Sequence, residues 1–111
     1  MINIEKRGNV EIISFTINKI NAFVTDEIRA EIIKEVENSP ANIIIDLKGV
    51  DYIDSTGFAC FLSVLKVARS NFSVLKFTNI EPRVQSLFET LHLHTVFEIY
   101  KDLDSCIRSF G

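Results

Sequence analysis

A continuous apolar run in the middle of the chain is the feature that most constrains the fold. Residues 42–47 read Asn-Ile-Ile-Ile-Asp-Leu, with no alternation of polar and apolar side chains. A strand with this pattern is typically covered on both faces, as a central strand of a parallel sheet is. The run therefore predicts a parallel sheet with helices packed on its faces.

Segments with strand and helix periodicity alternate along the rest of the chain. Ile2 and Ile4 alternate with polar residues, and Gly8-Asn9 predicts a hairpin turn into a second strand at residues 10–17. Further strands are predicted at 73–77 and 96–100. Apolar residues recur at helical spacing in four segments, namely 22–37, the stretch after Asp54, the stretch after Pro82, and 103–110.

The order of these elements is ββαβαβαβα, and Ser39-Pro40 is predicted to end the first helix. This order predicts an α/β fold with a mixed, mostly parallel sheet of four to five strands, in a single layer covered by four helices. A chain of 111 residues is one domain's worth, so residues 1–111 are expected to form a single domain.

Composition argues against several classes of function. The net charge of −3 provides no general positive field, so direct binding of nucleic acid is not expected. The longest apolar stretch, residues 58–62, is far shorter than the ~18 residues of a membrane span. The N-terminus lacks the pattern of a secretory signal, which predicts a cytoplasmic protein. Cys60 and Cys106 lack metal-ligand spacing and are predicted to be core residues, and the free chain is expected to be a monomer.

The most informative local motif is the predicted turn Asp54-Ser55-Thr56-Gly57. Its simplest interpretation is a helix cap, because side-chain oxygens of these residue types accept from the free N–H groups of a first helical turn. Three consecutive oxygen-bearing side chains exceed what one cap needs, and Gly57 offers bare backbone to an approaching molecule. A helix N-terminus also favours an added phosphate, so Ser55 is a candidate phosphoacceptor. Its phosphate would lie near Asp54 and Asp51 and would oppose binding of a partner.

Residues 43–58, which read IIIDLKGVDYIDSTGF, resemble the signature of STAS domains and, among these, of bacterial anti-sigma factor antagonists. Residues 79–84, which read NIEPRV, are similar to the segment that opens the third helix in that family. The resemblance implies the STAS fold. It also implies a partner-switch protein that catalyses nothing itself and needs no cofactor.

The resemblance further implies which partners and residues take part. In that family, the serine that matches Ser55 is phosphorylated by an anti-sigma factor that is itself a serine kinase, and a cognate protein phosphatase reverses the modification. The unphosphorylated antagonist binds the anti-sigma factor and frees the sigma factor. In this chain Ser55 would be the acceptor, Asp54 and Thr56 would shape the switch loop, and Gly57 with Phe58 would lie under the docked partner.

The chain departs from the family pattern in two loops. Members often carry a glycine and an acidic residue where the kinase docks, before the first helix, whereas this chain reads Asn-Lys-Ile-Asn at 18–21. The glycines usual before the fourth strand are replaced by Ser-Asn-Phe-Ser at 70–73. The ring of Phe72 is expected to pack under this loop, with contact to a partner as the alternative.

Other functions were weighed against this one. A hydrolase with Ser55 as nucleophile and His92 or His94 as base lacks the Gly-x-Ser-x-Gly motif, and both histidines are predicted to lie at the surface or in turns. Asp46 as a phosphoacceptor lacks the acidic pair that would hold magnesium, so its carboxylate is predicted to order the loop at 48–51. STAS domains also serve as noncatalytic subunits of lipid or solute ABC transporters or of stress-signalling scaffolds, which stays open as the alternative function.

Overall fold

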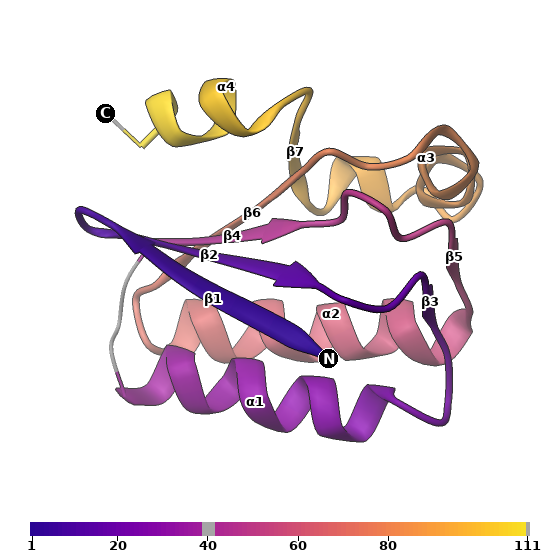
Figure 1. Ribbon diagram of the computed structural model, residues 1–111, viewed down its shortest axis with the longest axis horizontal. Coiled ribbons are helices and arrows are strands. Elements are labelled where there is room, and N and C mark those ends of the chain that lie inside the picture. Colours follow the sequence, from indigo (N-terminus) through magenta and orange to yellow (C-terminus); the bar gives the residue numbers. More distant parts are fainter. Residues whose placement is uncertain (39–41, 111) are drawn as a thin grey trace.

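The computed structural model describes residues 1–38 and 42–110 (Figure 1). Its main sheet has five strands in the order β1-β2-β4-β6-β7. The first strand is antiparallel to the second, and the other neighbouring strands are parallel. This confirms the predicted α/β class and the mixed, mostly parallel sheet. The strands are β1 (Ile2–Arg7), β2 (Val10–Phe15), β4 (Asn42–Asp46), β6 (Val74–Thr78) and β7 (Glu98–Tyr100).

The apolar run forms β4, the central strand of the sheet. Ile43 and Ile45 belong to the main hydrophobic core, whereas Ile44 belongs to a second cluster with Cys106. Because successive side chains of a strand point to opposite faces, β4 is buried on both sides, as its sequence predicts.

Helices cover both faces of the sheet. Figure 1 shows α1 (Thr25–Asn38) and α2 (Ser55–Ser70) side by side on one face, and α4 (Leu103–Arg108) on the other. A shorter helix, α3 (Pro82–Thr90), lies at one end of the main sheet, near the short strand β5 (Tyr52–Ile53). The predicted helix stop at Ser39-Pro40 lies outside the described residues. Within the part of the chain that the structure describes, no helix has the length and apolar character needed to cross a membrane.

Three short elements differ from the sequence prediction. β3 (Lys19–Ile20) and β5 pair in parallel as a separate two-stranded sheet, too short to show a periodic pattern. A 3-10 turn, η1 (Leu93–Thr95), precedes the predicted last strand, and its C-cap Val96 has a helical backbone conformation, so the strand begins at Glu98 rather than at Val96. His92 is the N-cap of this turn and His94 lies within it, and both are exposed, as predicted.

The first helix begins at Thr25 rather than near Ala22. The side-chain oxygen of Asn21 accepts from the backbone N–H of Phe23 at 3.0 Å, and its backbone oxygen accepts from Val24 and Thr25. These bonds fold the segment before the helix into a turn, and they leave the Phe23 side chain 96% exposed.

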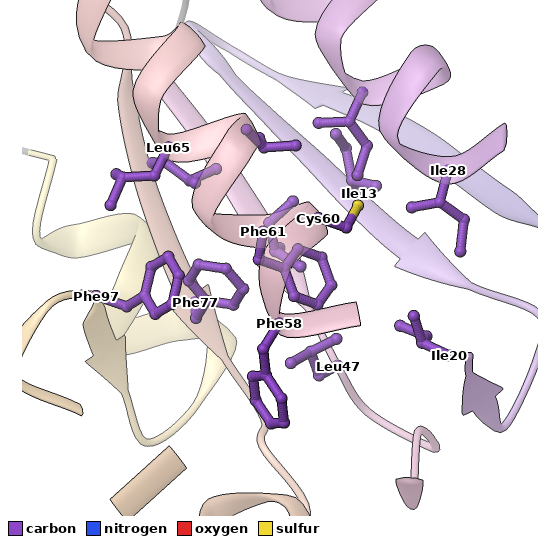
Figure 2. Packing of buried hydrophobic residues seen from close by; sticks show 14 of the residues in the cluster. Ile13, Ile20, Ile28, Leu47, Phe58, Cys60, Phe61, Leu65, Phe77 and Phe97 are labelled. Carbon is purple, nitrogen blue, oxygen red and sulfur yellow. The ribbon is translucent and has the colours of Figure 1, made fainter. Parts of the chain in front are cut away.

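Several phenylalanine rings pack against one another in the main core between the sheet and α2 (Figure 2). Phe77 of β6 lies 5.3 Å from the ring of Phe61 and 4.7 Å from that of Phe97. Cys60 and Cys106 are fully buried, which confirms their prediction as core residues. Burial raises the pKa of both thiols to about 11, so neither is a reactive thiolate at neutral pH.

A buried lysine holds the C-terminal segment on the second face of the sheet. Lys76 of β6 donates to the hydroxyl of Ser109 at 2.8 Å, and its Nζ lies 4.2 Å from the centre of the Phe110 ring. Glu98 lies 4.0 Å away. These contacts compensate the buried charge and dock α4 over Ile12 and Ile44.

Replacement of Glu11 by glutamine is expected to stabilise the protein at neutral pH. Glu11 lies on β2 and is 3% exposed, and burial together with the nearby Glu35 raises its pKa above the ordinary 4.5, although Lys6 lies 3.6 Å away. The folded state therefore binds this proton more tightly than the unfolded state, so the free energy of unfolding falls as pH rises from about 4.5 through the raised pKa.

The stability gain of Glu11→Gln is accordingly expected to be absent in acid and to grow as the pH rises, as measured by urea unfolding across a pH series. Glu5→Gln on the exposed neighbouring strand serves as the control and is expected to change stability by less than about 0.5 kcal/mol. A Glu11→Gln variant that is less stable than the wild type at pH 7 would contradict this account.

Candidate functional site

The turn that leads into α2 is built around Asp54. This residue is the N-cap of the helix, and its carboxylate accepts from the backbone N–H groups of Thr56 at 3.0 Å and Gly57 at 3.1 Å. The Thr56 hydroxyl donates to the same oxygen. The Thr56 hydroxyl and these backbone donors hold the pKa of Asp54 below its usual value, so the carboxylate stays charged at neutral pH.

The short strands β3 and β5 set the position of this turn. The backbone N–H of Asp54 donates to Ile20 at 3.1 Å, and that of Asp51 donates to Asn18 at 2.9 Å. The backbone N–H of Ala22 also stabilises the charged Asp54. The loop before α1 and the turn before α2 are therefore held side by side.

Ser55 occupies the first position of α2, directly after the cap. Its side chain is exposed, and none of the hydrogen bonds between described residues uses its hydroxyl. Asp54 supplies the cap and Thr56 supports it, so the three oxygen-bearing side chains have different roles. This geometry leaves the Ser55 hydroxyl free for modification at the positive end of a helix.

Gly57 has a different role from the one its sequence context suggests. The residue is buried, and a Cβ built on it would lie 2.5 Å from Cγ2 of Ile53 and 3.0 Å from Cγ2 of Ile20. The absent side chain thus gives room to the two short strands, not to an approaching molecule. Glycine here lets the turn at residues 54–57 pack directly on β3 and β5.

Phe58, which the family resemblance places under a docked partner, has its side chain buried in the core of the single chain. Phe58 is 4% exposed, and its ring lies 5.1 Å from that of Phe88 in an edge-to-face arrangement. Phe58 is one of the buried core residues drawn in Figure 2. Helical periodicity places Phe58 on the apolar stripe of α2, and that stripe faces the protein interior.

A Gly57→Ala substitution is expected to destabilise the protein by about 1–3 kcal/mol, because the added methyl overlaps two β-branched side chains. Alanine normally stabilises a helix relative to glycine, so the sign of this effect is diagnostic. Urea unfolding provides the measurement. Ser55→Ala at the exposed neighbouring position is the control, and an equally stable Gly57→Ala protein would show that the packing is not tight.

Asp46 orders the loop before the switch turn, as predicted. Its carboxylate accepts from the backbone N–H of Lys48 at 3.0 Å and from the side-chain amide of Asn79 at 3.1 Å. Glu81, the first residue before α3, accepts from the backbone N–H of Gly49 at 2.8 Å instead of capping its own helix. Two carboxylates from different segments thus hold the loop that carries Asp51 toward Ser55.

An open polar depression lies beside this turn. Its volume is about 660 Å³. Lys19 and Arg83 contribute positive charge to it and Asp51 a negative charge, and Tyr52 is 45% exposed. The other lining residues are Asn18 and Asn21.

Phe23 is the residue of this face that sequence reasoning missed. It lies next to Ala22, whose backbone contacts Asp54, and it is almost fully exposed. A large apolar side chain so exposed, one residue from the backbone group that contacts Asp54, is a candidate for partner contact. The sequence offers no separate signal for it, because Phe23 lies outside the helical apolar spacing that starts at Ile28 and precedes the helix in the turn at Asn21.

The fold and site together define a small α/β binding module with a serine presented on a capped helix N-terminus. Residues 1–106 match the STAS domain family, and the chain belongs to that family. It is 31% identical over 100 residues to the anti-sigma-B factor antagonist of Listeria monocytogenes, an alignment that covers 88% of this chain and 86% of the relative. The predicted family is thereby confirmed.

Solved structures agree with this assignment. The chain superposes with a TM-score of 0.88 on an anti-sigma-factor antagonist (STAS) domain protein from Planctomyces limnophilus, at 17% identity, covering 99% of this chain and 97% of that one. It also superposes on the Bacillus anti-sigma factor antagonist SpoIIAA in its unphosphorylated form, with a TM-score of 0.80 and 16% identity over 100% of this chain and 97% of that one. SpoIIAA has also been solved in a phosphorylated form, to which the TM-score is 0.73 at 15% identity, over 98% of this chain and 99% of that one. At these identities the likeness shows a common fold.

Proposed function

We propose that this protein is an anti-sigma factor antagonist that binds an anti-sigma factor when Ser55 is unmodified and is released when Ser55 is phosphorylated. The observation that carries this proposal is the exposed, unshared hydroxyl of Ser55 beside a charged Asp54 that already caps the helix. The Listeria monocytogenes relative is an anti-sigma-B factor antagonist, which favours this function over a transporter or scaffold subunit.

Phosphorylation at this position changes charge more than structure. A phosphoserine carries about −1.5 to −2 charges at pH 7 and suits a helix N-terminus. The new charge would lie next to Asp54 and in the vicinity of Asp51, so this face would become strongly negative. The fold is expected to remain, while docking of a partner on the face is opposed.

The partners in this proposal are an anti-sigma factor with serine kinase activity and a cognate protein phosphatase. Their face on this protein consists of Ser55, Phe23, Tyr52 and the depression with Lys19 and Arg83. The positive charge of Lys19 calls for an acidic group at the facing position of the partner.

A pull-down from native lysate tests the proposed function. Tagged Ser55→Ala and Ser55→Asp proteins serve as paired baits, and bound proteins are identified by mass spectrometry. Capture of a serine kinase by the alanine bait, with its loss on the aspartate bait, is the expected result. Equal capture of transporter ATPase or permease subunits by both baits would instead assign the protein to the alternative function.

A Phe23→Ala substitution is expected to weaken binding of the anti-sigma factor about tenfold or more without loss of stability, since exposed aromatic residues often dominate an interface. Isothermal titration against the captured kinase measures the affinity. Phe72→Ala is the matched control, because Phe72 is also 96% exposed but lies beyond the opposite end of α2. If Phe23→Ala and Phe72→Ala bind the anti-sigma factor with equal affinity, Phe23 is not part of the proposed interface.

A further inference from the structure

The end of α2 that lies farthest from Ser55 carries an exposed aromatic residue in an unfavourable backbone conformation. Phe72 is 96% exposed and has a φ of 58°, so the expectation that its ring packs under the loop is wrong. Its backbone N–H donates to Arg69 at 3.2 Å, and that of Ser73 donates to Ala68 at 2.8 Å. These two bonds form a Schellman motif, whose left-handed position usually holds glycine. Phenylalanine at this position therefore strains the backbone, and its ring gains no packing within the single chain in return.

A small apolar groove lies directly beside Phe72. It is formed by the last part of α2, by β6 and by the segment that enters β7, and its volume is about 230 Å³. Small-molecule sites usually measure ~300–1,000 Å³, so this groove suits one side chain better than a metabolite. Two of its lining residues, Val74 and Val96, are each 40% exposed. Its apolar lining residues are Leu65, Val74, Leu75 and Val96.

Charges of opposite sign border the same groove. Arg69 and Glu98 both line it and both are exposed. Within the described residues Arg69 takes part in no ion pair, whereas Glu98 is 4.0 Å from Lys76. One patch thus presents a protruding ring, a groove for a ring, and both signs of charge. Such a surface is complementary to a second copy of itself.

We propose that this face forms a two-fold symmetric dimer, in which Phe72 of each copy enters the groove of the other copy and Arg69 of each faces Glu98 of the other. A stable interface buries about 800 Å² on each partner. This patch is limited to one helix end and the adjoining parts of two strands, so the dimer is weak and depends on concentration.

The dimer leaves the switch face free. α2 has 16 residues, which separates Phe72 from Ser55 by about 24 Å (Figure 1). The self-association is therefore independent of the proposed function, and each is tested separately.

Sedimentation velocity on the full chain over a concentration series up to the millimolar range tests the proposal. The wild type is expected to pass from monomer to dimer, and Phe72→Gly to raise the dissociation constant at least tenfold. Phe72→Gly is a safe variant because glycine is favoured at the left-handed position, and its melting temperature checks the fold. Phe23→Ala removes an equally exposed ring and is expected to associate like the wild type. A wild type that stays monomeric, or a Phe72→Gly protein that dimerises equally well, would overturn the proposal.

A charge exchange tests the two-fold arrangement itself. Arg69→Glu places like charges opposite each other in its own dimer, and Glu98→Lys does the same with positive charges. Each variant alone is expected to dimerise less tightly than the wild type. An equimolar mixture restores both opposite-charge contacts and is expected to form a mixed dimer. A mixture that associates no better than its components would exclude this pairing.

Discussion

Phosphorylation of Ser55 is expected to lower the affinity for the anti-sigma factor about a thousandfold, with little change in the fold. The phosphate adds about −1.5 to −2 charges, which must be desolvated when a partner covers the turn. Asp54 is held in its charged form and does not relieve the repulsion by taking up a proton. A loss of about 4 kcal/mol corresponds to a thousandfold change and turns a micromolar complex into a millimolar one.

Isothermal titration of the unmodified and the stoichiometrically phosphorylated protein against the anti-sigma factor measures this loss. Ser55→Asp adds one charge in place of two and is expected to show a smaller loss in the same direction. Ser70→Asp is the matched control, since it adds the same charge to an exposed serine at the far end of α2. Equal affinities of the phosphorylated and unmodified proteins would refute the switch.

Truncation of Phe77 is expected to produce the largest loss of stability among single substitutions considered for this protein. Phe77→Ala should lower the free energy of unfolding by about 3–5 kcal/mol, because it removes a fully buried ring and leaves a cavity. The rings of Phe61, Phe88 and Phe97 all lie within 6.0 Å of it, centre to centre, so a cavity there is bordered by large rigid groups. Domains of this size are stable by only about 5–15 kcal/mol in total.

Urea unfolding of Phe77→Ala, followed by circular dichroism, tests this expectation. Phe23→Ala removes the same side chain from a position that is 96% exposed and should change stability by less than about 0.5 kcal/mol. The contrast between the two variants isolates burial from residue type. Similar losses in the free energy of unfolding of both variants would show that burial of Phe77 in the aromatic cluster does not stabilise the core.

The regular elements were predictable because their patterns are long. The isoleucines of β4 point to two cores, and the apolar stripes of α2 and α3 repeat over several turns. The short pairing of β3 with β5 was not predictable, because two residues show no period. This small sheet nonetheless positions the switch turn through the bond from Asp54 to Ile20.

The candidate site was predicted in part. Asp54 caps the helix and Asp46 orders its loop, and both roles follow from local chemistry that the residue types themselves carry. The role of Gly57 depends on Ile53 and Ile20, one of them far away in the sequence. Phe58 was expected beneath a partner and is buried against Phe88, whereas Phe23, for which the sequence made no prediction, is exposed after the turn at Asn21.

The sequence by itself determined the α/β class, the central strand and the serine at a helix N-terminus, since these follow from periodicity and from hydrogen bonds between near neighbours. The tertiary structure alone decided which side chains form the two exposed surfaces. Phe23 and Phe72 are both exposed because their backbones leave the helical path, whereas Phe58 follows it into the core. A periodic pattern predicts which face of a helix is buried, but the backbone turns at the helix ends and the segments that pack on them decide the exposure of the residues just outside it.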